Sequence, residues 1–262
     1  MSLPRILIVA GSDSGGGAGI QADIKTVTML GGHAMTAITA ITAQNTLGVQ
    51  AVMAVPAEIV VAQMRSVIED IGVDAVKIGM IGSPQVAQAV AEVLEQLRHL
   101  GEGGRGLPIV FDPVMIATSG SVLADAGTVA AFRRLMRLAT LVTPNLPEMA
   151  VLGGLDALVA EGLTVLAKGG HGEGDTVTDR LVGPDGEIAR WANPRIGTRH
   201  THGTGCTLAS AIATGLGAGM ALPDAIERGI AFVRASLGRA PGLGHGHGPM
   251  GQQLATGFTC PG

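Results

Sequence analysis

The feature that most constrains the fold is a repeated alternation between short apolar runs and segments with helical spacing. The pattern predicts strands at 5–10, 33–40, 74–78, 108–111, 141–143 and 163–167, and helices at 18–30, 56–71, 83–100, 126–138, 206–220 and 223–237. Such alternation is typical of an α/β fold, with a central, mostly parallel sheet covered by helices on both faces. A Gly-Pro-Asp-Gly turn at 183–186 adds a hairpin. Since no linker, repeat or charge run divides the chain, we expect a single domain over 1–262.

Side chains able to do chemistry follow several of these predicted strands. A glycine-rich loop, Gly11–Gly19, follows the first strand, and Gln44 lies after the second. Asp112 ends the fourth strand, Asn145 and Glu148 follow the fifth, and the run Lys168-Gly-Gly-His171 follows the sixth. Because ligands of open α/β sheets bind at the carboxyl ends of the strands, these residues are expected to surround one site.

The segment Thr201-His-Gly-Thr-Gly-Cys206 stands directly before a predicted helix. Glycines allow a tight turn and a close approach to a ligand, and the free N–H groups of a helix N-terminus attract anions such as phosphate. A cysteine at that position is expected to have a lowered pKa and to act as a base or a nucleophile. The structural alternative, a glycine-rich turn before a buried helix, is equally consistent with these six residues alone.

Composition excludes several classes of function. The net charge is −4, aromatic residues are 2% of the chain, and no basic run occurs, which disfavours nucleic-acid binding. The uncharged stretch 203–222 contains many small residues and lacks flanking aromatics, so we interpret it as a buried helix and expect no membrane span. Two distant cysteines, Cys206 and Cys260, and the lack of a signal peptide favour the cytoplasm.

Each remaining motif has a structural alternative. The loop Gly11–Gly19 lacks the spacing of Rossmann and P-loop motifs, and it could be a substrate loop or a flexible surface loop. Asp112 could bind Mg²⁺ or cap a turn. Asn145 and Glu148 could face Mg²⁺ and phosphate or form a capping box. Lys168 is one of only three lysines and is better placed for phosphate than for solvent. The pairs His200-x-His202 and His245-x-His247 lack a third ligand, so zinc is not expected.

In order along the chain, these motifs resemble the ribokinase-like kinases and, within them, the hydroxymethylpyrimidine/phosphomethylpyrimidine kinases. The resemblance rests on AGSDSGGGAGIQADIKT near the N-terminus, ITAQNTLGV at 41–49, KIGM at 77–80, DPVM at 112–115, TPNLPE at 143–148, KGGH at 168–171, THGTGC at 201–206 and GHGHGP at 244–249. It implies a three-layer ribokinase-like fold. It also implies phosphoryl transfer from ATP with Mg²⁺, first to 4-amino-5-hydroxymethyl-2-methylpyrimidine and then to its monophosphate, in thiamine biosynthesis.

The resemblance also implies roles for individual residues. The pyrimidine would be read by Gln44, with Asp23, Gly11, Met80 and Val114 completing its pocket. Cys206 matches the base position, with Gly203, Thr204, Gly205 and Lys168 beside the transferred phosphoryl group. Asn145, Thr201 and Lys168 would bind the nucleotide, and Asp112 and Glu148 the metal. Two small molecules are thus the expected partners, and a homodimer is left open.

The chain departs from the family in two respects. The segment 149–167 is shorter and lacks part of a helix, and the sequence contains no tyrosine, so any stacking on a heterocycle must come from Phe or Trp or be replaced by aliphatic contacts. Two other interpretations remain open at this stage: a pyridoxal kinase, and a pyrimidine-binding protein without catalysis on the same scaffold.

Overall fold

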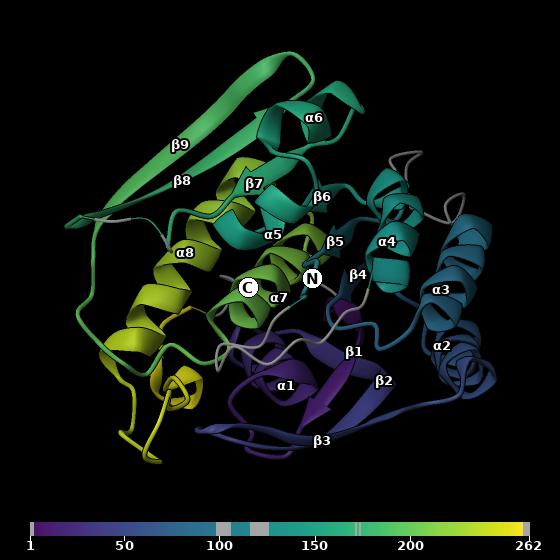
Figure 1. Cartoon of the computed structure of the whole chain (residues 1–262), viewed down its shortest axis with the longest axis horizontal. Helices are drawn as coiled ribbons and strands as arrows, with labels where there is room; N and C mark the ends of the chain where they lie inside the picture. Colours follow the sequence, from purple (N-terminus) through teal and green to yellow (C-terminus); the bar gives the residue numbers. More distant parts are fainter. Residues whose placement is uncertain (1–2, 98–105, 116–125, 171, 173, 259–262) are drawn as a thin grey trace.

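A nine-stranded sheet forms the centre of the computed structural model, which describes residues 3–97, 106–115, 126–170, 172 and 174–258 (Figure 1). The strand order is β3-β2-β1-β4-β5-β6-β7-β8-β9. The strands are β1 (Arg5–Asp13), β2 (His33–Asn45), β3 (Gly48–Ala54), β4 (Ala75–Ile78), β5 (Ile109–Phe111), β6 (Leu141–Val142), β7 (Val165–Ala167), β8 (Thr176–Gly183) and β9 (Gly186–Pro194). Strands β2, β1, β4, β5, β6 and β7 are parallel, whereas β3, β8 and β9 pair with antiparallel neighbours at the two edges.

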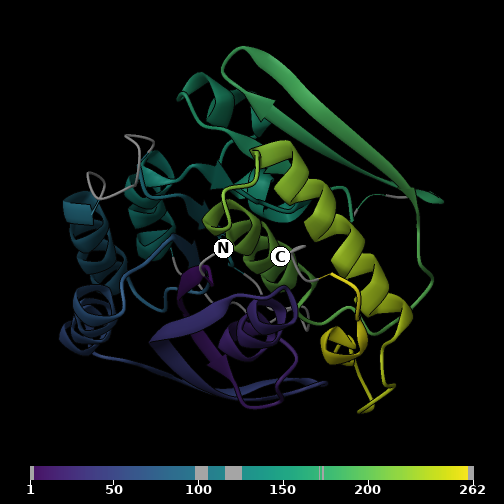
Figure 2. The ribbon, with the colours of Figure 1, turned by 180° about the vertical axis from the view of Figure 1, so that it is seen from behind.

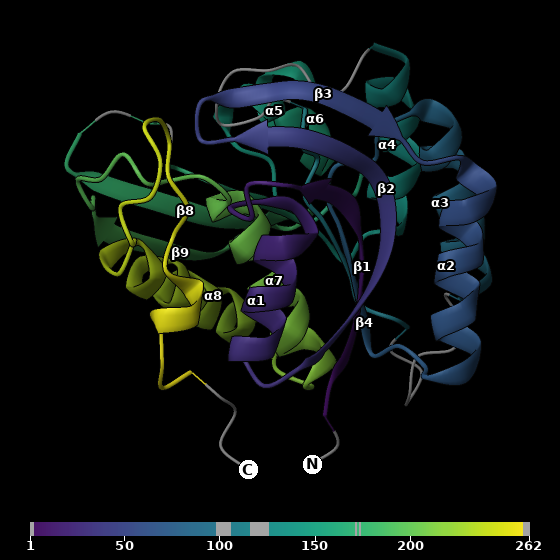
Figure 3. The same cartoon turned by 90° about the horizontal axis from the view of Figure 1, so that it is seen from below.

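Helices cover both faces of this sheet. The helices are α1 (Gly19–Met29), α2 (Ala57–Asp70), α3 (Pro84–Leu97), α4 (Ala126–Leu138), α5 (Leu146–Val151), α6 (Leu155–Ala160), α7 (Thr204–Gly217) and α8 (Leu222–Gly238). Helices α2 to α6 pack on one face, and α1, α7 and α8 pack on the other, which Figure 2 shows from behind and Figure 3 from below. The three-layer α/β prediction is confirmed.

Alternating side chains of β1 explain why both faces are covered. Leu7 and Val9 point into the core under α2 and α3, while Ile6, Ile8 and Ala10 point into the core under α1 and α7. All five side chains are at most 1% exposed. A strand buried on both sides reads as a continuous apolar run, which is the pattern of a central parallel strand.

The predicted elements are present, with differences at the edges. Strand β2 continues to Asn45 and turns into β3, a strand that the sequence did not predict because its residues are largely exposed and show no alternation. The short helix α6 in the segment 149–167 was also not predicted. The end of the third predicted helix, His171 and Cys260 lie outside the described residues. Helix α7 is buried, and among the described helices none is both long and apolar enough for a bilayer.

Candidate active site

A cavity of about 740 Å³ opens at the carboxyl ends of the parallel strands. All but one of the site residues predicted from sequence line this cavity. They are Gly11, Gln44, Met80, Asp112, Val114, Asn145, Glu148, Lys168, Thr201, Gly203, Thr204, Gly205 and Cys206. The exception, Asp23, is fully buried behind the wall. Among the described residues of the lining there is no Phe or Trp, and aliphatic side chains such as Val177, Ile196 and Leu208 form its apolar part.

The N-terminus of α7 faces the cavity through a left-handed glycine turn. Helix α7 begins at Thr204, and its N-cap Gly203 has a φ of +86°, in the left-handed region. No side chain caps this helix end. The Thr204 N–H donates to the Thr201 carbonyl at 3.3 Å, so the Gly205 N–H is the first that the described contacts leave for a ligand. The predicted anion-binding turn therefore has the required geometry, with a buried helix following it.

Asp112 and Lys168 form an ion pair at the same helix end. Lys168 Nζ donates to Asp112 Oδ1 at 2.7 Å, and the hydroxyl of Thr143 donates to the same oxygen at 2.9 Å. A Cβ on Gly205 would lie 3.2 Å from Asp112 Oδ2 and 3.3 Å from Lys168 Nζ. Glycine at this position thus lets both charges approach the helix backbone. Burial lowers the pKa of Lys168, but the nearby Asp112 and Glu148 outweigh it and hold the pKa above its usual value.

Asn145 and Glu148 confirm one of the two interpretations left open by the sequence, the capping box, and the role toward Mg²⁺ and phosphate stays a prediction. The Asn145 side chain accepts from the Glu148 backbone N–H, and the Glu148 carboxylate accepts from the Asn145 N–H, which completes a capping box on α5. Both residues also line the cavity. Burial, with the charge of Asp112, raises the pKa of Glu148 to about 7 even though Lys168 opposes this effect.

The donor set at this position fits a magnesium ion. Asp112 and Glu148 are 2% and 5% exposed, and each carboxylate raises the pKa of Lys168 by its charge. Mg²⁺ in proteins is usually held by one or two carboxylates together with substrate phosphates and water. Burial is the main cause of the raised pKa of Glu148 and the charge of Asp112 a lesser one, and a cation between the two carboxylates would oppose both effects.

Cys206 lies at the third position of α7, but its ionisation differs from our prediction. Burial raises the pKa of the thiol to about 11, although the charge of Lys77 and a hydrogen bond with the Gly19 backbone favour the thiolate. The expectation of a lowered pKa was therefore wrong for the ligand-free chain. Desolvation and the nearby carboxylates outweigh the helix N-terminus, because the half-buried Cys206 lies in the cavity wall, where packing removes much of the water around its thiol.

Lys77 is a cavity residue that the sequence did not bring forward. Its side chain is fully buried on β4 and lines the cavity, and its Nζ donates to Asp23 Oδ2 at 2.7 Å. The other Asp23 oxygen accepts from the Ser210 hydroxyl at 2.7 Å. Asp23 thus holds Lys77 and does not itself line the cavity. The signal in the sequence was a rare lysine within a buried strand.

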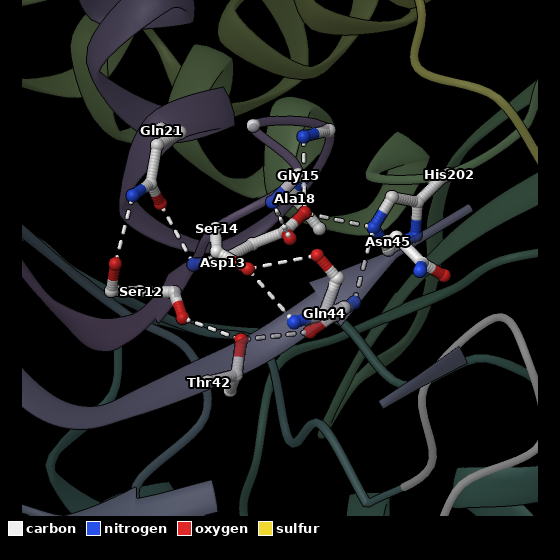
Figure 4. A network of polar contacts seen from close by, with 12 residues as sticks. Ser12, Asp13, Ser14, Gly15, Ala18, Gln21, Thr42, Gln44, Asn45 and His202 are labelled. Carbon is white, nitrogen blue, oxygen red and sulfur yellow. Dashed lines mark hydrogen bonds and ion pairs between the residues drawn. The ribbon is translucent and has the colours of Figure 1, made fainter. Parts of the chain in front are cut away.

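The glycine-rich loop is organised by Asp13, as Figure 4 shows. The Asp13 carboxylate accepts from the backbone N–H groups of Gly15, Gly17 and Ala18 at 2.8–3.0 Å. It also lies 2.9 Å from His202 Nε2, which in turn lies 3.2 Å from the Gln44 amide. Neither Asp13 nor His202 was predicted as a site residue. An aspartate two residues before a glycine cluster was the available signal for an Asx turn.

Known proteins that are similar to this chain agree with this geometry. The model of the family described as "Phosphomethylpyrimidine kinase" matches residues 13–251. A hydroxymethylpyrimidine/phosphomethylpyrimidine kinase of Streptomyces coelicolor is 45% identical over 97% of this chain and 96% of its own length. Its counterpart from Rhizobium meliloti is 45% identical over 93% of this chain and 95% of its own.

Two solved structures have the same fold. A phosphomethylpyrimidine kinase from Clostridium difficile has a TM-score of 0.73 at 35% identity, covering 89% of this chain and 98% of its own. A pyridoxal kinase from Staphylococcus aureus in complex with AMP-PCP and pyridoxal has a TM-score of 0.83 at 28% identity, covering 97% and 95%.

Proposed function

Because this chain belongs to the phosphomethylpyrimidine kinase family, we propose that it phosphorylates 4-amino-5-hydroxymethyl-2-methylpyrimidine and then its monophosphate in thiamine biosynthesis. ATP is the phosphoryl donor in both steps. The observation that carries the proposal is the convergence of the α7 N-terminus, Lys168 and Asp112 on one cavity that also contains Gln44. This cavity combines an anion site with an amide that can both donate to and accept from a heterocycle.

In the first step the hydroxymethyl oxygen attacks the γ-phosphorus, the bond to the β-phosphate oxygen breaks, and ADP leaves. The transition state spreads negative charge over the moving phosphoryl oxygens, so catalysis requires positioning and charge stabilisation. The N–H group of Gly205 at the start of α7, together with Lys168, supplies both without a covalent intermediate. Asn145 and Thr201 contact the nucleotide.

Cys206 receives the hydroxyl proton as its thiolate in this proposal. With a pKa of about 11, only about one thiol in a thousand is ionised at pH 8 in the ligand-free enzyme. The first step should therefore become faster as the pH rises. The second step uses a phosphate oxygen that is already ionised, so it needs no base.

Mg²⁺ would be held by Asp112 and Glu148, and it would neutralise charge on the donor phosphates. Lys168, which donates to Asp112 and lines the same cavity, would neutralise charge on the transferred phosphoryl group. Glu148 must be ionised to bind the ion, and its pKa of about 7 makes binding weaker in acid.

The test is mass detection of the mono- and diphosphate products formed from the pyrimidine alcohol with ATP and Mg²⁺. Pyridoxal is the competing substrate, since a pyridoxal kinase is among the similar structures. A clear preference for pyridoxal in a competition assay would overturn the substrate assignment. Ligand binding without ATP turnover at any Mg²⁺ concentration would indicate a binding protein.

A further inference from the structure

His202 joins the glycine-rich loop to Gln44, and neither the fold nor phosphoryl transfer accounts for it. It is 7% exposed and stands one residue before Gly203, which has a left-handed backbone conformation. A Cβ on Gly17 would lie 3.4 Å from the imidazole Cγ and closer still to Cδ2, so the loop packs directly on the ring. The ring is therefore held in one place, with Nε2 between Asp13 and Gln44 (Figure 4).

The first step concerns the proton on His202 Nε2. Asp13 Oδ2 lies 2.9 Å away and already accepts two backbone N–H groups. Burial raises the pKa of Asp13, but the hydrogen bonds from His202 and the backbone outweigh it and leave the pKa below its usual value. An ionised carboxylate only accepts, so Nε2 carries the hydrogen and donates. A second N–H donor cannot bind to that same nitrogen.

The second step concerns the hydroxyl proton of Thr42. Its Oγ1 lies 2.9 Å from the Ser12 carbonyl oxygen and 3.2 Å from Gln44 Oε1. A backbone carbonyl only accepts, and a hydroxyl has a single proton. The shorter contact takes that proton, so Thr42 presents lone pairs to Gln44.

Both constraints act on the Gln44 amide, and they agree. As placed, the amide nitrogen, a donor, lies 3.2 Å from the protonated Nε2 of His202, which is also a donor. The amide oxygen, an acceptor, lies 3.2 Å from Thr42 Oγ1, which presents lone pairs. A half-turn of the amide exchanges its oxygen and nitrogen and removes both conflicts. The nitrogen then donates to Thr42 Oγ1, and the oxygen accepts the longer branch of a three-centre bond from His202 Nε2–H, whose shorter branch goes to Asp13.

We propose that His202, held by Asp13, is a positioning residue that fixes the Gln44 amide with its oxygen on the His202 side and its nitrogen on the Thr42 side, and so selects the heterocycle edge that the site accepts. The inference rests on the proposed function for the identity of the heterocycle. One lone pair and one N–H of the amide remain for the ligand.

The fixed amide requires a particular order of groups on the ligand. A 4-aminopyrimidine places a donor, its amino group, beside an acceptor, its ring nitrogen, and this order matches the amide. A 4-oxopyrimidine in the same pose places an acceptor beside a ring N–H, which reverses the order. Rejection of a mispaired edge by a site with fixed polar groups is larger than rejection by apolar shape alone.

The experiment compares 5-hydroxymethyl-2-methylpyrimidine carrying either a 4-amino or a 4-oxo group. For each we would measure kcat/KM by phosphate product formation and Kd by titration calorimetry. The wild type should prefer the amino compound by about 100-fold or more. In His202→Ala the amide is free to turn, and this preference should fall at least ~10-fold, mainly through KM of the pyrimidine.

Matched variants separate positioning from folding. His33→Ala removes an exposed histidine at the opposite end of β2 and should keep the wild-type preference. Thr42→Val removes the other constraint with little change of shape and should also relax the preference, whereas Thr42→Ser should retain it. This second variant keeps the inference testable if His202→Ala does not fold. In a Gln44→Ala background, adding His202→Ala should change the preference no further.

An amino-to-oxo preference unchanged within twofold in both His202→Ala and Thr42→Val would overturn the inference. Equal loss of both compounds would do the same, since it indicates only a structural role. A wild type that binds the amino compound selectively but transfers no phosphate, with the predicted relaxation in the variants, would support the positioning role and refute the kinase proposal.

Discussion

Substitution of Gly203 by alanine is the sharpest test of the anion-binding turn. Gly203 is the N-cap of α7 with a φ of +86°, a conformation that costs an L-residue about 1–2 kcal/mol. An added Cβ would overlap the carbonyl oxygen of Gly17 and lie 3.0 Å from its carbonyl carbon and 3.2 Å from Ala18 Cα. These are backbone atoms, so the loop itself must move.

That movement carries a second penalty. Gly17 and Ala18 donate to the Asp13 carboxylate at 3.0 and 2.8 Å, and a hydrogen bond to a charged acceptor contributes about 1.5–3 kcal/mol. With one of these bonds lost, Gly203→Ala should lower the free energy of unfolding by about 3–5 kcal/mol. If the loop holds its position and the helix N-terminus moves instead, a displacement of about 1 Å should lower kcat/KM for ATP about 100-fold.

Urea unfolding and steady-state kinetics would be measured on the same preparations. Gly197→Ala is the control, because its added Cβ meets nothing within 4 Å and Gly197 is exposed. Wild-type stability together with wild-type kcat/KM in Gly203→Ala would refute the close approach of this turn to the glycine-rich loop.

Three further predictions follow from the buried charges. With Cys206 as base, kcat/KM of the first step should rise about tenfold per pH unit between pH 7 and 9. Cys206→Ser should slow the first step far more than the second. Equal slowing of the two steps, measured in separate assays, would exclude Cys206 as the base. Because the pKa of Glu148 is raised to about 7, its stabilising contribution is complete below about pH 4.5 and is lost as the pH rises through 7. In urea unfolding of the ligand-free proteins, the free energy of unfolding of Glu148→Gln relative to wild type should therefore increase by up to about 3 kcal/mol between pH 4.5 and 8. A difference that does not change with pH would contradict this pKa. Lys77→Met should lower the free energy of unfolding by about 3–5 kcal/mol because it leaves Asp23 buried without its partner, and Lys77→Met/Asp23→Leu should recover part of that loss; a double variant less stable than Lys77→Met would refute the unpaired carboxylate as the cause.

Much of the fold could be predicted from the sequence because the spacing of apolar residues along the chain follows directly from which side chains are buried. The run 5–10 indicated a strand buried on both faces, and Ile6 to Ala10 are at most 1% exposed in β1. Strand β3 was missed because it is an exposed edge whose pairing with β2 leaves no periodic pattern. The parallel order of the central strands then determined that the chemical groups would gather at one edge.

The sequence by itself determined which residue types surround the cavity, because each follows a strand or begins a helix. Only the tertiary structure decided how they are paired. Asp23 was expected at the pocket and instead lies behind Lys77, 54 positions away in the chain. The pKa of Cys206 was expected to be lowered and is raised, because desolvation depends on packing around the thiol and not on its place in a helix. The link between Asp13 and His202 spans 189 positions, and no local pattern encodes a contact between residues that far apart.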